Sequence, residues 1–110
     1  MSYSIIAVPT FRKELKKLSK RYPSLKTDLA LLFENLETNP EYGTALGNNC
    51  YKIRLSITSK NKGKYGGARV ITNFVIDGKT VYMLSIYDKS EKKILTDKEL
   101  KELLKSIPQN

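Results

Sequence analysis

Residues 68–87 read ARVITNFVIDGKTVYMLSIY and decide the fold, because they contain two apolar strands separated by a turn. The segment 68–76 is apolar on both faces, which is typical of a central strand. Asp77-Gly78 is a strong signal for a β-hairpin turn, and residues 80–87 supply the second strand. The stretch therefore predicts a hairpin at the centre of a sheet.

A third strand precedes this hairpin. Between residues 51 and 58 apolar and polar residues alternate, which is typical of a strand with one buried and one solvated face. Its apolar members are Tyr51, Ile53, Leu55 and Ile57. Residues 59–67 are rich in Lys and Gly and predict a connecting loop. The turn-forming residues at 40–49 predict an ordered surface loop before the strand.

Two helices are expected near the N-terminus, after a short β-prone run at residues 3–8. The first covers 9–21 and begins at Pro9, whose fixed φ suits a first helical turn. The second begins after Ser24 as a cap and ends at Asn39-Pro40. Apolar residues recur at helical spacing at Phe11, Leu15 and Leu18 in the first helix, and at Leu25, Leu29, Leu32, Phe33 and Leu36 in the second. Together they predict a helical hairpin that lies on one face of the sheet.

A third helix closes the chain. Thr96-Asp97-Lys98-Glu99 has the pattern of a capping box, and leucines continue at helical spacing toward Pro108. The element order is therefore β-α-α-β-β-β-α. It predicts an α+β fold in a single domain over residues 1–110, with an antiparallel sheet, the N-terminal helical hairpin on one face, and a C-terminal helix.

The charge is strongly positive and unevenly placed. Among 110 residues, 20 Lys and Arg stand against 11 Asp and Glu, a formal net charge of +9. Residues 9–21 carry six cations and one anion, and residues 49–69 carry six cations and no anion. Residues 22–48 sum to −3, and residues 70–110 to +1. Two basic blocks thus hold the excess charge, which favours a polyanionic partner.

The composition also excludes several kinds of site. The sequence has no His and one cysteine, Cys50, so it predicts no zinc site, no His-activated nucleophile and no internal disulfide. No apolar run approaches the roughly 18 residues that span a bilayer. The N-terminus lacks the pattern of a signal peptide. We therefore expect a cytoplasmic protein that does not associate with a membrane.

A cluster of cations is the candidate site. Lys52 and Arg54 are two residues apart on one strand, so they point to the same face about 7 Å from each other. If the strands at 51–57 and 68–76 pair antiparallel, Arg69 lies close by as a third member. Further cations are expected above them on the connecting loop, namely Lys60, Lys62 and Lys64.

Such a cluster suits RNA cleavage through the 2′-hydroxyl. That reaction needs a base, an acid and stabilisation of a dianionic phosphorane. An Arg fork binds two phosphate oxygens but is a poor base. A lysine that is desolvated or crowded by other cations loses its proton more easily, which makes Lys52 or a neighbouring Lys the better candidate for acid–base work. Tyr87, near the end of the last strand, could stack on a base or donate a proton.

Plainer interpretations stand beside these. Lys52 and Arg54 would form an ordinary solvated strand face in many proteins, and Tyr87 would be a half-buried packing residue. The helix cations, including Lys13 and Lys16, either contact RNA or are ordinary for a surface helix. The loop lysines either contact RNA phosphates or simply lie in an exposed loop.

Three strings resemble the core of the RelE/ParE superfamily of toxins, most closely its HigB-type branch. They are YKIR at 51–54, KGKYGGARVI at 62–71 and YMLSIYDKSE at 82–91. The resemblance implies the toxin of a type II toxin–antitoxin system, a ribosome-dependent and metal-independent mRNA endoribonuclease that inhibits translation. It implies no cofactor. The implied partners are the ribosome with its mRNA and a cognate antitoxin. The antitoxin is expected to carry a helix-turn-helix domain.

The resemblance also assigns residues. Lys52, Arg54 and Arg69 match the family's basic catalytic positions, and Lys89 matches a further basic one. Two positions depart from the family pattern, because Ser90 stands where a second Arg often follows and Thr96 stands where a catalytic Tyr often sits. The resemblance therefore leaves the acid and base unassigned, with Tyr87 as a substitute.

Two alternatives remain open from the sequence. One is a ParE-like toxin that inhibits DNA gyrase through protein contacts. The other is a non-catalytic RNA-binding module. The basic residues Lys52, Arg54 and Arg69 favour the nuclease, because a gyrase inhibitor has no need of a phosphate-binding cluster there.

Overall fold

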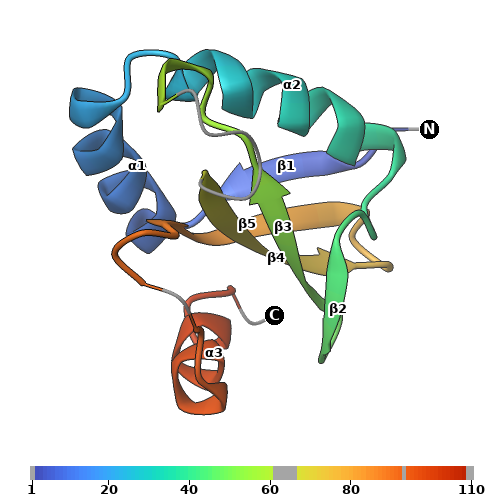
Figure 1. Cartoon of the computed structure of the whole chain (residues 1–110). Coiled ribbons are helices and arrows are strands. Elements are labelled where there is room, and N and C mark those ends of the chain that lie inside the picture. Colours follow the sequence, from blue (N-terminus) through green and yellow to red (C-terminus); the bar gives the residue numbers. More distant parts are fainter. Residues whose placement is uncertain (1, 61–66, 93, 109–110) are drawn as a thin grey trace.

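The structure is a computed structural model that describes residues 2–60, 67–92 and 94–108. Its elements follow the predicted order with two additions, the short strand β2 and a single-turn 3₁₀ helix (Figure 1). In chain order they are β1 Ser4–Ala7, α1 Pro9–Arg21, α2 Leu25–Thr38, β2 Thr44–Gly47, β3 Cys50–Leu55, the single-turn 3₁₀ helix η1 Thr58–Lys60, β4 Ala68–Val75, β5 Thr80–Asp88 and α3 Asp97–Leu104.

The strands of the described ranges form one sheet with the spatial order β1-β5-β4-β3-β2. The pairs β3–β4 and β4–β5 are antiparallel, as predicted, and the added strand β2 is antiparallel to β3 as well. The prediction of a purely antiparallel sheet is wrong for β1, which pairs with β5 in parallel. The cause is topological. The helical hairpin and three strands separate β1 from β5 along the chain, so no tight turn forces the two strands to run in opposite directions.

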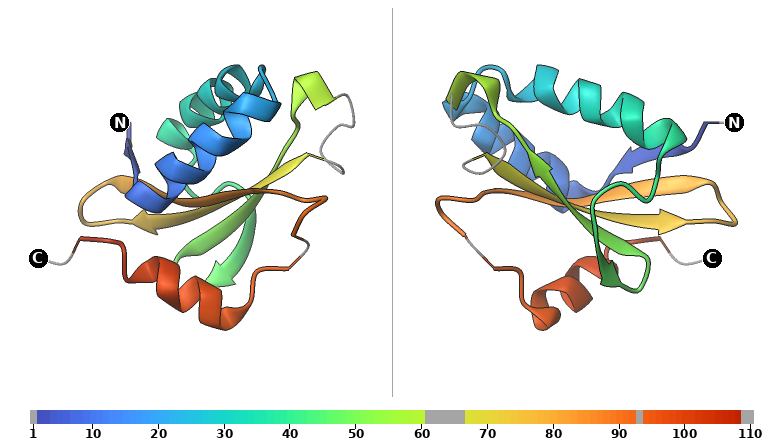
Figure 2. Two further views of the ribbon diagram at one scale, coloured as in Figure 1. Left: turned by 90° about the vertical axis from the view of Figure 1, so that its left-hand side faces the viewer. Right: turned by 45° about the vertical axis from the view of Figure 1, so that its right-hand side comes forward.

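Helices cover both faces of the sheet. The hairpin of α1 and α2 lies over one face and α3 lies under the other (Figures 1 and 2). The apolar stripes predicted for the hairpin supply part of the core, with Phe11, Leu25 and Leu36 fully buried. They pack in one cluster with sheet residues such as Ile53, Val70 and Ile86. The α+β fold predicted from the sequence is confirmed.

The added strand β2 lies within the segment expected to be a surface loop. It pairs with β3 through a turn at Asn48 and Asn49, both of which have positive φ. This is the backbone that a two-residue hairpin requires, and Asn tolerates it better than most residues. Before β2, Gly43 has a φ of +113°, and a Cβ there would lie 2.7 Å from the backbone oxygen of Lys52. A glycine at this position lets the chain approach β3 closely.

Side-chain capping bonds are present at one of the two helix starts for which a cap was predicted. The capping box of α3 is present, because Thr96 Oγ1 accepts from the Glu99 N–H and the Glu99 side chain accepts from the Thr96 N–H. Ser24 occupies the N-cap position of α2, as predicted, but its side chain makes no cap hydrogen bond. Its hydroxyl instead donates to Asp28 and accepts from the Ser59 N–H, which ties the start of α2 to η1.

Among the helices that the structure describes, none is long and apolar enough to cross a membrane.

Candidate functional site

Three predicted site residues lie in a row across three strands. Arg54 on β3 is the register partner of Arg69 on β4, and Arg69 is the register partner of Tyr87 on β5. Directly paired residues project from the same face of a sheet. Lys52 lies two residues before Arg54 and shares that face. We call Lys52, Arg54, Arg69 and Tyr87 the cationic row. It lies on the face opposite the helical hairpin, because the alternate residues of β3 pack in the hairpin-side core.

The row runs from solvent into the protein. Arg54 is exposed and Lys52 is half-buried, whereas Arg69 is only 4% exposed and Tyr87 8%. The Arg69 guanidinium donates a hydrogen bond of 3.0 Å to the Ala68 carbonyl oxygen. Burial and the adjacent Arg54 cation lower the pKa of Arg69, while Tyr87 opposes this effect. Two arginines side by side repel each other, so an anion placed between them would be attracted strongly.

The outer end of the row opens onto a concave surface. Lys52 and Arg54 line a pocket of about 700 Å³ with Tyr42, Gly43 and Thr44. Gly43 is the residue whose close approach to β3 was noted above, so it shapes the wall beside Lys52. Exposed Arg54 and half-buried Lys52 thus border an open hollow on the surface.

Tyr87 closes the inner end of the row. Within the described part of the chain its hydroxyl is buried and has no hydrogen-bond partner. Burial raises the pKa of Tyr87, against the lowering effect of the Arg69 and Lys92 cations. A raised pKa keeps the phenol protonated at neutral pH, so the hydroxyl is available as a hydrogen-bond donor. A buried donor without a partner is costly, so an acceptor atom on a bound molecule would be favoured beside it.

Lys89 continues β5 beyond its last assigned residue. Its N–H donates to the Gly67 carbonyl oxygen at 3.1 Å, so the ladder between β4 and β5 extends one step further. Lys89 is half-buried and lies two residues after Tyr87. It lies in the turn that follows Asp88, where the Glu91 N–H donates to the Asp88 carbonyl oxygen, so strand alternation does not assign it to the face of the cationic row.

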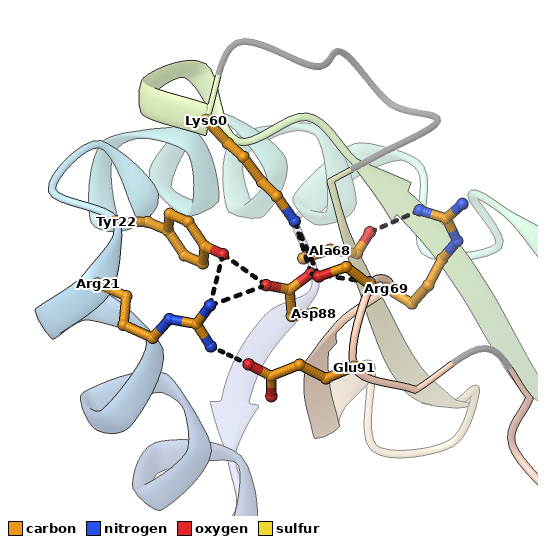
Figure 3. A network of polar contacts seen from close by, with 8 residues as sticks. Arg21, Tyr22, Lys60, Ala68, Arg69, Asp88 and Glu91 are labelled. Atoms are coloured by element: carbon orange, nitrogen blue, oxygen red, sulfur yellow. Dashed lines mark hydrogen bonds and ion pairs between the residues drawn. The ribbon is translucent and has the colours of Figure 1, made fainter.

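Lys60 does not join the row, contrary to the prediction. Its ammonium group bonds Asp88 at 2.7 Å and lies over the Tyr22 ring (Figure 3). The Lys60 side chain is 11% exposed. Because η1 folds back toward α2, this lysine reaches the hairpin side of the sheet, where it serves an internal ion pair. It is therefore not available for RNA binding in this structure.

Asp88 is the centre of that ion pair. Its carboxylate accepts from the Tyr22 hydroxyl at 2.6 Å and from the N–H and hydroxyl of Ser90. Arg21 lies 4.0 Å away and also pairs with Glu91. Burial opposes ionisation of Asp88, but the hydrogen bonds from Lys60, Tyr22 and Ser90 outweigh it and hold its pKa well below the ordinary value. We call Arg21, Tyr22, Lys60 and Asp88 the neutralised cluster.

The other predicted RNA-binding lysines are not brought to the row. Lys13 and Lys16 are exposed on α1, which covers the opposite face of the sheet. Lys16 lies beside Arg12, Lys20 and Lys26 in a groove between α1 and α2. Lys62 and Lys64 lie outside the described residues.

Glu14 is a site residue that the sequence analysis missed. One oxygen of its carboxylate accepts from the Ser85 hydroxyl at 2.8 Å and from the Ile86 N–H at 3.2 Å. β1 ends opposite Met83, so Glu14 takes the place of a neighbouring strand along the second half of β5. Burial raises its pKa, and its bonds to Ser85 and Ile86 and the Lys92 cation limit the rise. One signal was present in the sequence, because Glu14 is the single anion among the six cations of residues 9–21.

We searched the described residues for side chains that could bind a metal ion. Within residues 2–60, 67–92 and 94–108, no group of three or more His, Cys, Asp or Glu side chains could hold a metal ion.

The fold has clear relatives among solved structures, although the sequence matches no protein-family profile. A free double-arginine mutant of the Escherichia coli toxin RelE is 19% identical, with a TM-score of 0.66 over 98% of this chain and 100% of that one. The same mutant bound to a peptide of the antitoxin RelB is 24% identical, with a TM-score of 0.51 over 86% and 100% of the two chains.

A further relative comes from the Mycobacterium tuberculosis toxin–antitoxin complex RelBE2. It is 17% identical, with a TM-score of 0.54 over 80% of this chain and 92% of that one. All three likenesses are to RelE-type toxins or their complexes. The resemblance to the HigB-type branch is not tested by them and stays a prediction. The chain has the RelE toxin fold.

Proposed function

We propose that this chain is the toxin of a type II toxin–antitoxin system and that it cleaves mRNA on the ribosome without a metal ion. The cationic row carries the proposal. It holds two register-paired arginines, a lysine beside them and a buried tyrosine hydroxyl on one face of the sheet. The RelE fold supports it, since the neighbouring structures are RelE toxins and their antitoxin complexes.

The row suits the charge that develops during cleavage. The 2′-oxygen attacks phosphorus, the bond from phosphorus to the 5′-oxygen breaks, and a 2′,3′-cyclic phosphate remains. Arg54 and Arg69 can each offer a fork of N–H donors to the equatorial oxygens of the dianionic phosphorane. Arg69 is buried, so its field there is less screened by water than that of a surface cation.

Two protons must also move. One leaves the 2′-hydroxyl and one reaches the departing 5′-oxygen. Lys52, on the face of the row, and Lys89, two residues after Tyr87, are our candidates for these transfers. Tyr87 contacts the bound nucleotide through its ring or its hydroxyl.

The partners follow from the same proposal. Two of the similar structures are toxin–antitoxin complexes, and a third contains an antitoxin peptide. We infer a cognate antitoxin, with a helix-turn-helix domain, and a ribosome carrying mRNA as the target in the cytoplasm. A net charge of +9 would draw the protein toward ribosomal RNA, and added salt should weaken that binding steeply.

Controlled expression tests the nuclease directly. The protein is induced in growing bacteria, and translated mRNA is mapped by primer extension. Growth arrest with discrete cuts is expected for the wild type, whereas both should disappear in Arg69→Ala. The matched control is Lys26→Ala, which removes an exposed cation from α2 and should leave the cuts unchanged.

One outcome would replace this function by another. Growth arrest that survives the double substitution Lys52→Ala and Arg69→Ala, together with loss of DNA supercoiling, would point to a gyrase inhibitor. Binding of ribosomes without any cleavage by the wild type would point to a non-catalytic RNA-binding module.

A further inference from the structure

A second pocket adjoins the inner end of the cationic row. It has a volume of about 320 Å³ and lies between β5, α1 and α3. We call it the base pocket. The residues of its lining that matter here are Glu14, Ser85, Tyr87, Lys92, Leu95 and Leu103. Its size is at the lower end of the range for small-molecule sites, roughly 300 to 1,000 Å³.

Two polar groups of the base pocket lack a full set of partners. The Tyr87 hydroxyl is buried without a hydrogen-bond partner among the described residues. Both hydrogen bonds that the structure gives Glu14 end on the same oxygen, Oε1. In the described part of the chain no bond reaches its other oxygen. The pocket thus presents a donor from Tyr87 and an acceptor from Glu14.

The remaining walls are suited to a flat, partly polar ring. Leu95 and Leu103 supply apolar surface. Lys92 contributes positive charge near both Glu14 and Tyr87 and is itself paired with Glu99. Pockets that combine apolar walls with a few placed polar groups fix the orientation of a ligand.

The distance from the cationic row to the base pocket is similar to the length of one nucleotide. Neighbouring strands lie about 4.8 Å apart, so the path from Arg69 on β4, past Tyr87 on β5, to Glu14 beyond β5 covers roughly 10 Å. This is comparable to the length of a nucleotide from its phosphate to the far edge of its base. A phosphate held by Arg54 and Arg69 can therefore place its own base in the pocket.

We propose that the base pocket binds guanine and that Glu14 determines this specificity. The inference rests on the proposed function, because the phosphate on the row belongs to the RNA substrate. Guanine presents an acceptor, O6, beside two donors, N1–H and the 2-amino group. O6 accepts from the Tyr87 hydroxyl, and the two donors face the Glu14 carboxylate. Adenine and cytosine each present one ring acceptor beside a single amino donor, so they can pair with both groups but cannot give the carboxylate the second donor that guanine supplies.

The structural role of Glu14 alone does not require a carboxylate. A glutamine could accept the same hydrogen bonds from Ser85 and Ile86 through its amide oxygen. The carboxylate is also the less favourable choice for folding, because burial raises its pKa. Glu14 therefore keeps a negative charge that costs stability, although a neutral glutamine would serve the fold equally well. Such residues are typical of functional sites.

Nucleotide binding to the purified chain tests the inference. 5′-GMP, 5′-IMP, 5′-AMP and 5′-CMP are titrated separately while the amide signals of Ser85, Ile86 and Tyr87 are followed by NMR. We expect 5′-GMP to bind tightest and 5′-IMP, which lacks the 2-amino group, to bind more weakly. Glu14→Gln replaces the unbonded acceptor by an amide donor and should weaken 5′-GMP binding at least about tenfold. The control Glu34→Gln makes the same charge change on exposed α2 and should bind like the wild type.

Three results would overturn the base pocket. They are absence of 5′-GMP binding, equal binding of all four nucleotides, and an unchanged 5′-GMP affinity in Glu14→Gln. The mRNA mapping described above tests the nuclease separately from the base pocket. Cuts without guanine selectivity would remove the base pocket and leave the nuclease, whereas selective 5′-GMP binding without cuts would leave the pocket and remove the nuclease.

Discussion

The cationic row and the neutralised cluster meet on opposite faces of β5, yet they treat charge in opposite ways. Ala68 and Arg69 are consecutive on β4, and Tyr87 and Asp88 are consecutive on β5. Alternation along the strands sends Asp88 toward Lys60 and Arg21, and it sends Tyr87 toward Arg69. Figure 3 shows the Arg69 guanidinium turned away from the Asp88 carboxylate.

The difference separates structural charge from functional charge. In the neutralised cluster each cation meets a carboxylate, and this pairing holds the hairpin against the end of β5. In the row two arginines repel each other, which favours binding of an external anion. The number of cations does not distinguish these cases. The neutralised cluster is built around the carboxylate of Asp88, whereas the row sets one arginine beside another, and four predictions test this comparison.

The largest effect is expected in the neutralised cluster. Asp88→Asn removes the partner of Lys60, whose ammonium then stays buried without a counter-charge. We expect the free energy of unfolding to fall by about 3 to 5 kcal/mol, measured by urea denaturation. The control is Asp77→Asn, which removes an exposed carboxylate from the β4–β5 turn. It should change the free energy of unfolding little. A loss equal to that of the control would show that the cluster does not hold the fold.

Arg69→Met is expected to affect activity rather than stability. Losing one donor group for the developing charge should lower ribosome-dependent cleavage by at least about 100-fold. The free energy of unfolding should stay the same or rise, because a buried cation next to Arg54 has been removed. Cleavage assays and urea denaturation of the same variant check that activity falls while stability does not. A protein that loses both activity and fold would contradict the proposed separation.

Acid should weaken the neutralised cluster specifically. The folded-state pKa of Asp88 is lowered, so its contribution to stability is full above the ordinary aspartate pKa of about 3.9 and is lost as pH falls toward the native value. Unfolding free energies measured from pH 6 to pH 2 should therefore converge for the wild type and Asp88→Asn. Parallel curves for the two proteins would show that Asp88 titrates normally.

The smallest effect concerns Glu14. Its folded-state pKa is raised, so its ionised form costs stability as pH rises from the ordinary glutamate value through the native one. Glu14→Gln should therefore gain up to about 1 kcal/mol at pH 7, and the gain should vanish below about pH 4. Thermal unfolding at the two pH values measures this. A destabilised variant at pH 7 would mean that the charge itself supports the fold.

Local signals predicted most of the fold. Pro9 and Asn39-Pro40 fixed the helical hairpin, Asp77-Gly78 fixed the β4–β5 turn, and Thr96 with Glu99 predicted the capping box. Each signal acts over a few residues, so the sequence alone displays it. Strand β2 was missed because it is four residues long and is surrounded by turn-forming residues.

Site residues were predictable where register alone decides their neighbours. Pairing the strands at 51–57 and 68–76 was enough to bring Arg54 next to Arg69. Lys60 was misassigned because its partner, Asp88, is 28 residues away and is reached only through the fold of η1. Glu14 was missed because its position depends on β1 ending before β5 does.

That short β1 also limits how another polypeptide could extend the sheet. Along the second half of β5 the chain's own glutamate already accepts the Ile86 N–H, so an incoming strand would have to displace it. The two borders of the described sheet are β1 and β2. An antitoxin that binds by strand addition would therefore register against Ser4–Ala7 or Thr44–Gly47, and amide hydrogen exchange slowed at those borders on complex formation would reveal which one it chooses.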